Sequence, residues 1–149
     1  MKLSIQLDNI KRLFLDSAPV IYYIEGDQRY LSYVDIVFNA LDEDSITAVT
    51  SPITLSECLI VPLRNAQEKV YNEFVDLIMN VPNVYFQVIN ETVALKAADL
   101  RARYNITLTD ALQIATAVIT ECDGFLTNDV ALKRVKEINV IVLSEFEPA

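Results

Sequence analysis

Four acidic residues and one hydroxyl residue stand where short apolar segments end or where helices are expected to begin. They are Asp16, Glu57, Asp110, Thr127 and Asp129. Carboxylates are oxygen ligands for hard divalent cations, and a bound cation makes hydroxide available from water near neutral pH. The chain has no His, which excludes His-based triads and His-containing zinc sites. A metal site in this chain would therefore be built from oxygens and would favour Mg²⁺ or Mn²⁺.

Each of these residues also has an ordinary structural explanation. Asp16 could close a strand in an Asx turn, and Glu57 could form a capping box with Thr54. Asp129 could lie in the first turn of a helix, where a negative charge suits the helix dipole. Thr127 could be an N-cap hydroxyl. The residue types alone leave both explanations open at every position.

Considered together, the acids are harder to explain as ordinary structural residues. Asp110 fits a capping box opened by Thr107, but Asp110 and Glu57 both stand among apolar neighbours. A buried carboxylate needs a partner, and the sequence offers no surplus of cations beside them. A shared divalent ion would supply the missing positive charge.

The segments that must position these acids alternate between strand-like and helix-like. Short apolar, β-branched runs predict strands, and the segments between them have helical periodicity. The predicted strands are 13–16, 45–50, 84–89, 124–127 and 140–143. The predicted helices are 20–25, 29–42, 52–61, 66–79, 91–103, 107–121 and 130–137. Ser51 is the expected N-cap of the third of these helices.

This alternation predicts an α/β fold, a three-layer α/β/α sandwich around a mainly parallel five-stranded sheet. The 149 residues fit one domain, with residues 1–12 as an N-terminal extension of unclear role that could add one turn. In 91–103 we expect Val93, Leu95, Ala98 and Leu100 to face inward. Ligands of such sheets bind at the carboxyl ends of the strands, where the four acids are expected to meet.

Composition narrows the class of protein further. The chain is 52% hydrophobic with two Gly, which is typical of a globular domain. Its net charge of −9 argues against a simple basic nucleic-acid binder. Cys58 and Cys122 lack CxxC spacing and are interpreted as buried, reduced thiols. No signal peptide and no membrane-length apolar run are visible, so we expect a cytoplasmic protein that does not cross a membrane.

Four motifs in order carry a family resemblance. LDSAPVIY at 15–22, SE at 56–57, LTDALQIATA at 108–117 and FLTND at 125–129 resemble the successive motifs of PIN domains, and most of all those of VapC-type toxin nucleases. The resemblance extends from about residue 13 to residue 143. It implies a five-stranded parallel sheet, an acidic site for Mg²⁺ or Mn²⁺, and hydrolysis of RNA phosphodiester bonds.

The resemblance also implies roles for single residues. Asp16, Glu57 and Asp110 match the family's three invariant-type acids, and Asp129 matches its more variable fourth. Asp16 and Asp110 would then bind metal directly or through water, Glu57 would bind metal or activate the attacking water, and Asp129 would support the site. Thr127 matches a hydroxyl residue beside the ligands, which would position a ligand or the scissile phosphate.

Partners follow from the same resemblance. A toxin nuclease of this type would cleave RNA, would pair with a small antitoxin protein and is expected to form a homo-oligomer. A catalytically silent PIN-like binding or scaffold module is the alternative, and the acidic net charge favours it slightly.

Two other acidic α/β classes are excluded by single positions. A haloacid-dehalogenase-like phosphatase needs a DxD motif, and position 18 is Ala. A response-regulator receiver needs an acidic pair at the first strand end and a Lys directly after a late strand. Ser17 follows Asp16, and no such Lys is present.

Overall fold

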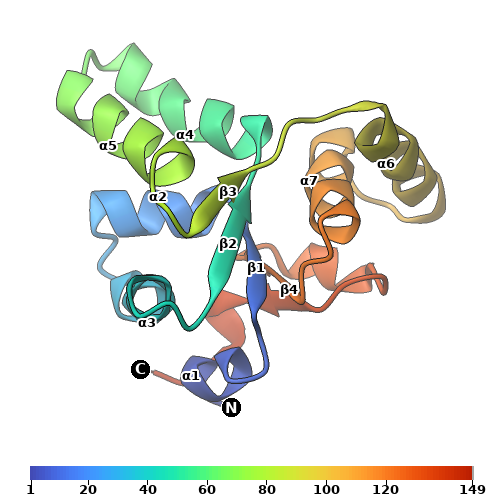
Figure 1. Ribbon diagram of the computed structural model, residues 1–149, viewed down its shortest axis with the longest axis horizontal. Helices are drawn as coiled ribbons and strands as arrows, with labels where there is room; N and C mark the ends of the chain where they lie inside the picture. The colour runs from blue at the N-terminus through green and yellow to red at the C-terminus, as the bar shows by residue number, and fades with distance from the viewer. Residues whose placement is uncertain (149) are drawn as a thin grey trace.

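A five-stranded sheet forms the centre of the molecule (Figure 1). The computed structural model describes residues 1–148, and all neighbouring strands pair in parallel in the order β3-β2-β1-β4-β5. The strands are β1 Arg12–Leu15, β2 Thr47–Thr50, β3 Val84–Phe86, β4 Gly124–Thr127 and β5 Val140–Val142. The predicted parallel sheet is confirmed, although its third strand is shorter than predicted.

Helices connect the strands and precede the first of them. The α-helices are α1 Leu3–Leu7, α2 Ser17–Glu25, α3 Leu31–Asp42, α4 Pro52–Arg64, α5 Glu68–Met79, α6 Glu91–Arg103 and α7 Leu108–Ile119. Two short 3-10 helices, η1 Val130–Arg134 and η2 Leu143–Glu145, flank β5. The prediction of a helix over 130–137 was therefore too long, and that segment forms a single 3-10 element. In the described residues no helix is long and apolar enough to cross a membrane.

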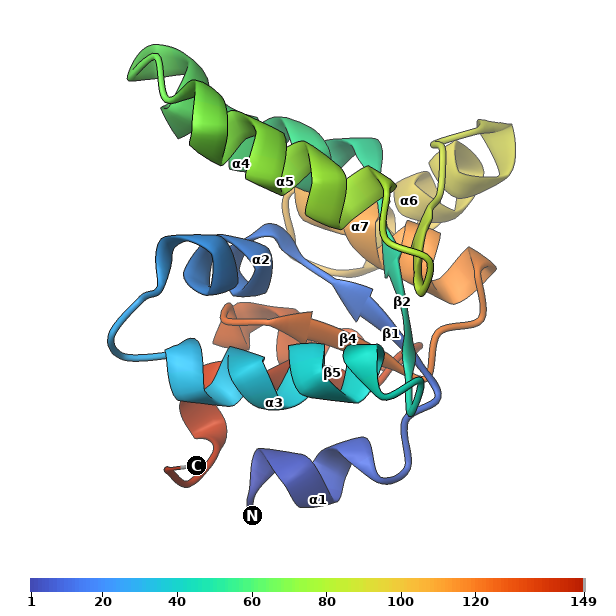
Figure 2. The same cartoon turned by 60° about the vertical axis from the view of Figure 1, so that its left-hand side comes forward.

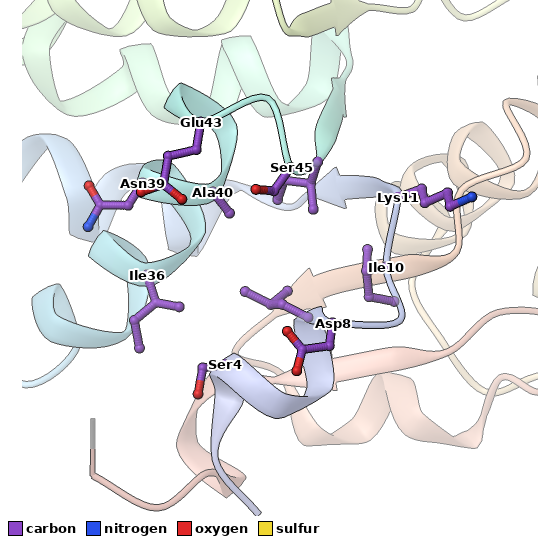
Figure 3. Close-up of a pocket in the computed structure, with 11 residues that line it drawn as sticks. Ser4, Asp8, Ile10, Lys11, Ile36, Asn39, Ala40, Glu43 and Ser45 are labelled. Atoms are coloured by element: carbon purple, nitrogen blue, oxygen red, sulfur yellow. The ribbon is translucent and has the colours of Figure 1, made fainter.

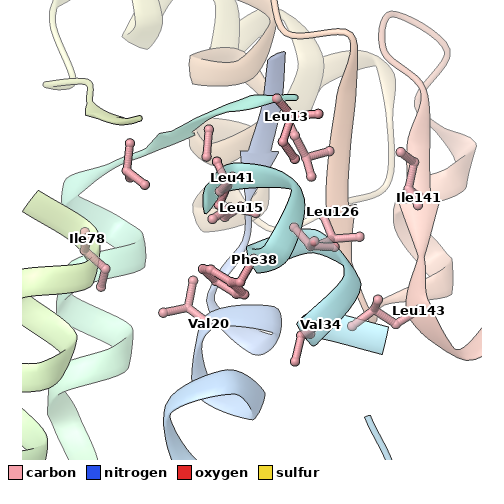
Figure 4. Packing of buried hydrophobic residues seen from close by; sticks show 14 of the residues in the cluster. Leu13, Leu15, Val20, Val34, Phe38, Leu41, Ile78, Leu126, Ile141 and Leu143 are labelled. Carbon is pink, nitrogen blue, oxygen red and sulfur yellow. The ribbon is translucent and has the colours of Figure 1, made fainter. Parts of the chain in front are cut away.

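The strands send alternate side chains into two apolar cores, one on each face of the sheet. Leu13 and Leu15 of β1 join a core with α2, α3 and α5, part of which Figure 4 shows between α3 and the sheet. Phe14 points the other way, into a core with α6 and α7. It stacks on Phe125 of β4 with ring centroids 5.1 Å apart. Helices on both faces of one sheet confirm the predicted three-layer sandwich.

The inward face of α6 differs from the prediction. Val93 and Leu100 are buried as expected, but Leu95 is 74% exposed and Ala98 is also exposed. Ala97 takes the inward position instead. The spacing 93, 97, 100 follows the helical i, i+4, i+7 pattern, and Leu95 lies off that stripe. Leu95 was predicted to face inward because it is apolar, and that property alone was not enough.

The direction of winding reverses at β1, which positions the acids. After β1 the chain adds β2 and β3 on one side of it, then returns to place β4 and β5 on the other. The carboxyl ends of β1 and β4 therefore open at a topological switch point, where parallel sheets bind ligands. Asp16 follows β1 directly, and its N–H donates to the Leu126 carbonyl of β4 at 3.0 Å.

The opposite end of the sheet is closed by the first residues of the chain. Leu3 and Leu7 of α1 are buried in the core beneath α3. The N-terminal extension, for which one added turn was predicted, forms this short helix. A cavity of about 510 Å³ lies between α1, α3 and the segments that lead into β1 and β2. Figure 3 shows Ser4 and Asp8 facing Ile36 across it.

Candidate functional site

Asp16 is the most buried of the four acids and lies at the carboxyl end of β1, beside β4. Two side chains donate to its carboxylate, the Thr127 hydroxyl to Oδ2 at 2.8 Å and Gln113 Nε2 to Oδ1 at 3.3 Å, and the Ser17 backbone is a third partner. Burial raises the pKa of Asp16 and outweighs these hydrogen bonds, which act to lower it. A nearby positive charge would therefore stabilise the ionised form of Asp16.

Thr127 and Asp129 follow β4 and hold the loop beside Asp16. The buried Thr127 hydroxyl donates to Asp16 and accepts from the backbone N–H of Asp129 at 3.2 Å. Asp129 itself is the N-cap of η1, with Oδ1 accepting from the Ala131 N–H at 3.0 Å. The interpretation of Thr127 as an N-cap was wrong, because the cap is Asp129 and Thr127 is a direct partner of Asp16.

Asp110 lies in the first turn of α7. The Thr107 hydroxyl caps this helix by accepting from the Asp110 N–H at 3.1 Å, so the cap expected from the sequence is present. Asp110 is half-buried. Its pKa is raised, first by burial and then by the negative charges of Asp129 and Glu57. This N-cap fixes the backbone of Asp110 in the first turn of α7, at the same edge of the sheet as the other acids.

Glu57 projects from α4, whose N-cap is Ser51 as predicted. The Glu57 carboxylate accepts a hydrogen bond from the Ser17 hydroxyl at 2.5 Å. The Thr54 hydroxyl donates to the Leu15 carbonyl at 3.0 Å instead of contacting Glu57. The capping box with Thr54 is therefore wrong. Glu57 is also exposed, so apolar neighbours in the sequence did not make it a buried acid.

The four acids affect one another electrostatically. The charge of Asp110 raises the pKa of Asp16, and those of Glu57 and Asp129 raise the pKa of Asp110. Within residues 1–148 none of the four forms an ion pair with Lys or Arg. The N-termini of α2, α4 and α7 lie at this edge, and their partial positive charges offset only part of the repulsion.

The donor set fits a hard divalent cation, but the side chains do not surround a ready-made site. Among residues 1–148, no three acidic, Cys or His side chains are arranged to hold a metal ion as they stand. Asp16, Glu57 and Asp129 instead each accept a hydrogen bond from a protein donor.

Room for a bound molecule adjoins Glu57. A cavity of about 330 Å³ lies between α2, α4 and α5 and is lined by residues that include Ile21, Glu25, Glu57 and Phe74. The larger cavity beside α1 (Figure 3) lies at the other end of the strands. Cavity volume therefore does not identify the acidic site, whereas the clustering of carboxylates does.

Three polar residues of the site were missed from the sequence. Ser51, Thr54 and Gln113 are fully buried and hydrogen-bonded to one another behind Asp16. A signal for Gln113 was available: it lies three residues after Asp110 in an otherwise apolar helix, which places both on one face. Ser51 and Thr54 were considered only as capping residues.

Comparisons with known proteins agree with the fold described above. Residues 13–138 match the family model of the PIN domain. No curated protein sequence matches the chain. VapBC2 from Rickettsia felis, solved bound to a promoter DNA fragment, shares 15% identity at a TM-score of 0.69, covering 88% of this chain and 98% of the other.

Two further solved structures have the same fold. VapC20 of Mycobacterium tuberculosis, described as a sarcin-ricin loop cleaving toxin, aligns with a TM-score of 0.66 and 11% identity over 85% of this chain and 98% of its own. FitAcB from Neisseria gonorrhoeae aligns with a TM-score of 0.60 and 17% identity over 90% and 99%. At these identities the likeness establishes the fold.

Proposed function

Since the chain belongs to the PIN domain family, we propose that it is a metal-dependent endoribonuclease that hydrolyses RNA phosphodiester bonds. One observation carries the proposal. Asp16, Glu57, Asp110 and Asp129 come from four separate parts of the chain to one edge of the sheet, and no Lys or Arg of residues 1–148 pairs with them. Such a cluster favours a divalent cation as its partner.

The roles of the acids follow from where each is held. A bound Mg²⁺ or Mn²⁺ supplies a water of lowered pKa and offsets charge on the phosphate oxygens. Asp16 and Asp110, set deepest, would hold the cation. Glu57, exposed beside an open cavity, can bind metal or take the proton of the attacking water. Asp129 would support the site from the outside.

Thr127 acts through Asp16. Its hydroxyl has one proton, and that proton is committed to Asp16 Oδ2. The oxygen also accepts from the Asp129 N–H, so one hydroxyl fixes the carboxylate of one acid and the backbone of another. Thr127 is in this view a positioning residue for two acids of the site.

The net charge of −9 is compatible with an RNA substrate when the cluster is metal-bound. The four acids contribute four negative charges at the place where a phosphate must approach. One or two divalent cations would cancel two to four of them. RNA binding is therefore expected to require the metal, which separates this protein from a basic nucleic-acid binder.

A more specific proposal is that this nuclease is the toxin of a toxin-antitoxin pair. The similar structures include one described as a toxin-antitoxin complex from Klebsiella pneumoniae, and VapC20, described as a toxin. By analogy with them, a small antitoxin protein would be the partner of this chain. A homo-oligomer is the assembly expected from the PIN-domain resemblance of the sequence. A catalytically silent PIN-like binding module remains the second candidate, supported by the absence of a preformed three-ligand site in residues 1–148.

The test is RNA cleavage by the wild type and two variants, Asp16→Asn and Asp110→Asn, with Mg²⁺, with Mn²⁺ and with chelator. Cleavage should require metal and should fall about 100-fold or more in both variants, because metal-centred charge stabilisation amounts to several kcal/mol. Asp99→Asn is the control, since Asp99 on α6 pairs with Arg103 outside the site. Equal cleavage by all four proteins would refute the site, and metal that changes neither stability nor cleavage would favour the binding module.

A further inference from the structure

Gln113 connects the acidic site to the interior of the fold. It is 1% exposed and lies one turn beyond Asp110 on α7. Its Nε2 donates to Asp16 Oδ1 at 3.3 Å and to Thr54 Oγ1 at 2.8 Å, and its Oε1 accepts from the Ser51 hydroxyl. One buried carboxamide thus joins α7, the N-terminus of α4 and the end of β1.

The direction of these hydrogen bonds is fixed by the neighbours. The Thr54 hydroxyl donates to the Leu15 carbonyl, so it has no proton left and must accept from Gln113. The Ser51 oxygen accepts from the N–H groups of Ile53 and Thr54 as the N-cap, which leaves its proton for Gln113 Oε1. The carboxamide therefore has one orientation, with its NH₂ group facing Asp16.

This orientation completes the support of the Asp16 carboxylate. Gln113 holds Oδ1 from α7, and Thr127 holds Oδ2 from the end of β4. Two side-chain donors from different elements fix the plane of the carboxylate, which keeps a lone pair for a further partner. A carboxylate would not serve at position 113, because it has no proton to donate when ionised and would add to the negative charge around Asp16.

We propose that Gln113 is a positioning residue that holds the Asp16 carboxylate in place to bind a divalent cation. The inference rests on the proposed metal-dependent function. Residues that hydrogen-bond a metal ligand typically change metal affinity or activity about 10- to 100-fold when replaced. Gln113 would act in this way while touching neither metal nor RNA.

The experiment measures Mn²⁺ binding by titration calorimetry for the wild type, Gln113→Met and Thr116→Val. Methionine keeps the length of the side chain and lacks the donor. Thr116 is the matched control: it is fully buried on the same helix, and its hydroxyl bonds only to the Leu112 carbonyl. We expect Gln113→Met to weaken Mn²⁺ binding about 10- to 100-fold and Thr116→Val to leave it unchanged.

Activity gives a second measurement. Excess Mn²⁺ should restore RNA cleavage by Gln113→Met, because the ligands are intact, and should not restore Asp16→Asn. Unchanged Mn²⁺ affinity in Gln113→Met would overturn the inference, as would an equal loss in Thr116→Val. If Gln113→Met fails to fold, Ser51→Ala, which removes the donor to Gln113 Oε1, must show a smaller loss in the same direction. A wild type that binds no Mn²⁺ would instead refute the proposed function.

Discussion

At the scale of single residues, Asp16 combines two opposing requirements. Its carboxylate must be ionised to bind a cation, but burial favours the protonated form and raises its pKa. The hydrogen bonds from Thr127 and Gln113 reduce that penalty without removing it. Residues that serve ligand binding commonly lower the stability of the ligand-free protein, and we expect Asp16 to have this effect.

We predict that Asp16→Asn raises the melting temperature of the metal-free protein at pH 7. A carboxyl whose pKa is raised on folding stabilises the fold at low pH, and this contribution is lost as the pH rises from 3.8 through the raised value. Asparagine is neutral, and its amide can accept from Gln113 and donate to Thr127. Thermal unfolding with chelator at pH 4 and pH 7 measures the effect, which should be larger at pH 7.

Asp99→Asn is the control for that measurement. Its pKa is lowered by Arg103, so its charge favours the folded state and removing it should not raise the melting temperature. Mn²⁺ should reverse the order, stabilising the wild type more than Asp16→Asn, because the cation binds only the folded site. An Asp16→Asn protein less stable than wild type in chelator at pH 7 would contradict the argument.

The residues predicted from the sequence follow strand ends or stand near helix starts, and those missed are buried polar residues that hydrogen-bond behind them. Asp16, Asp110, Thr127 and Asp129 could be placed because strand ends and helix starts are visible in the sequence. The spacing of Gln113 from Asp110 was visible, but its hydrogen bonds were not, because its partners Ser51 and Thr54 lie about 60 positions away and meet it only once the sheet has formed. Hydrogen-bond partners across such a separation have no local signature.

At the scale of elements, the sequence predicted where helices and strands form, but it predicted less well which face of a helix is buried. Strands β1 and β4 end where the apolar runs end, since their side chains are buried on both faces. Helix α6 has a low average hydrophobicity and carries apolar residues all round, so its buried stripe could not be read from residue type. The core beneath it selects the 93, 97, 100 stripe.

Two leucines of α6 provide a direct comparison. Leu100→Ala should lower the free energy of unfolding by about 2–5 kcal/mol, because it opens a cavity in a closed core. Leu95→Ala should change it by less than about 0.5 kcal/mol, because the side chain is 74% exposed. Urea unfolding of both variants measures the difference. Equal losses would mean that α6 is rotated about its axis relative to the structure described above.

At the scale of the whole molecule, the two ends of the sheet have different tasks. The carboxyl end carries the acids, the N-termini of three helices and the cavity beside Glu57. The amino end carries α1, which precedes the segment matching the PIN domain. The start of α1 also meets the segment that follows β5, since the Met1 amino group pairs with Glu147, and Figure 2 shows this start of the chain near that red segment. The sequence could indicate this extension as a turn but not its contacts, which depend on α3.

Helix α1 should therefore affect stability and leave the acidic site unchanged. Leu3 and Leu7 are buried against α3, whereas Ile5 is 54% exposed on the same helix. Leu3→Ala and Leu7→Ala should each lower the free energy of unfolding by about 2 kcal/mol or more, and Ile5→Ala by less than about 0.5 kcal/mol. The double variant should cost less than the sum of the single variants, because the loss is limited to the free energy with which this short helix docks. Urea unfolding tests the stabilities, and Mn²⁺ titration should give the same affinity for all four variants. A fall in Mn²⁺ affinity that follows the loss of stability would show that the two ends of the sheet are coupled.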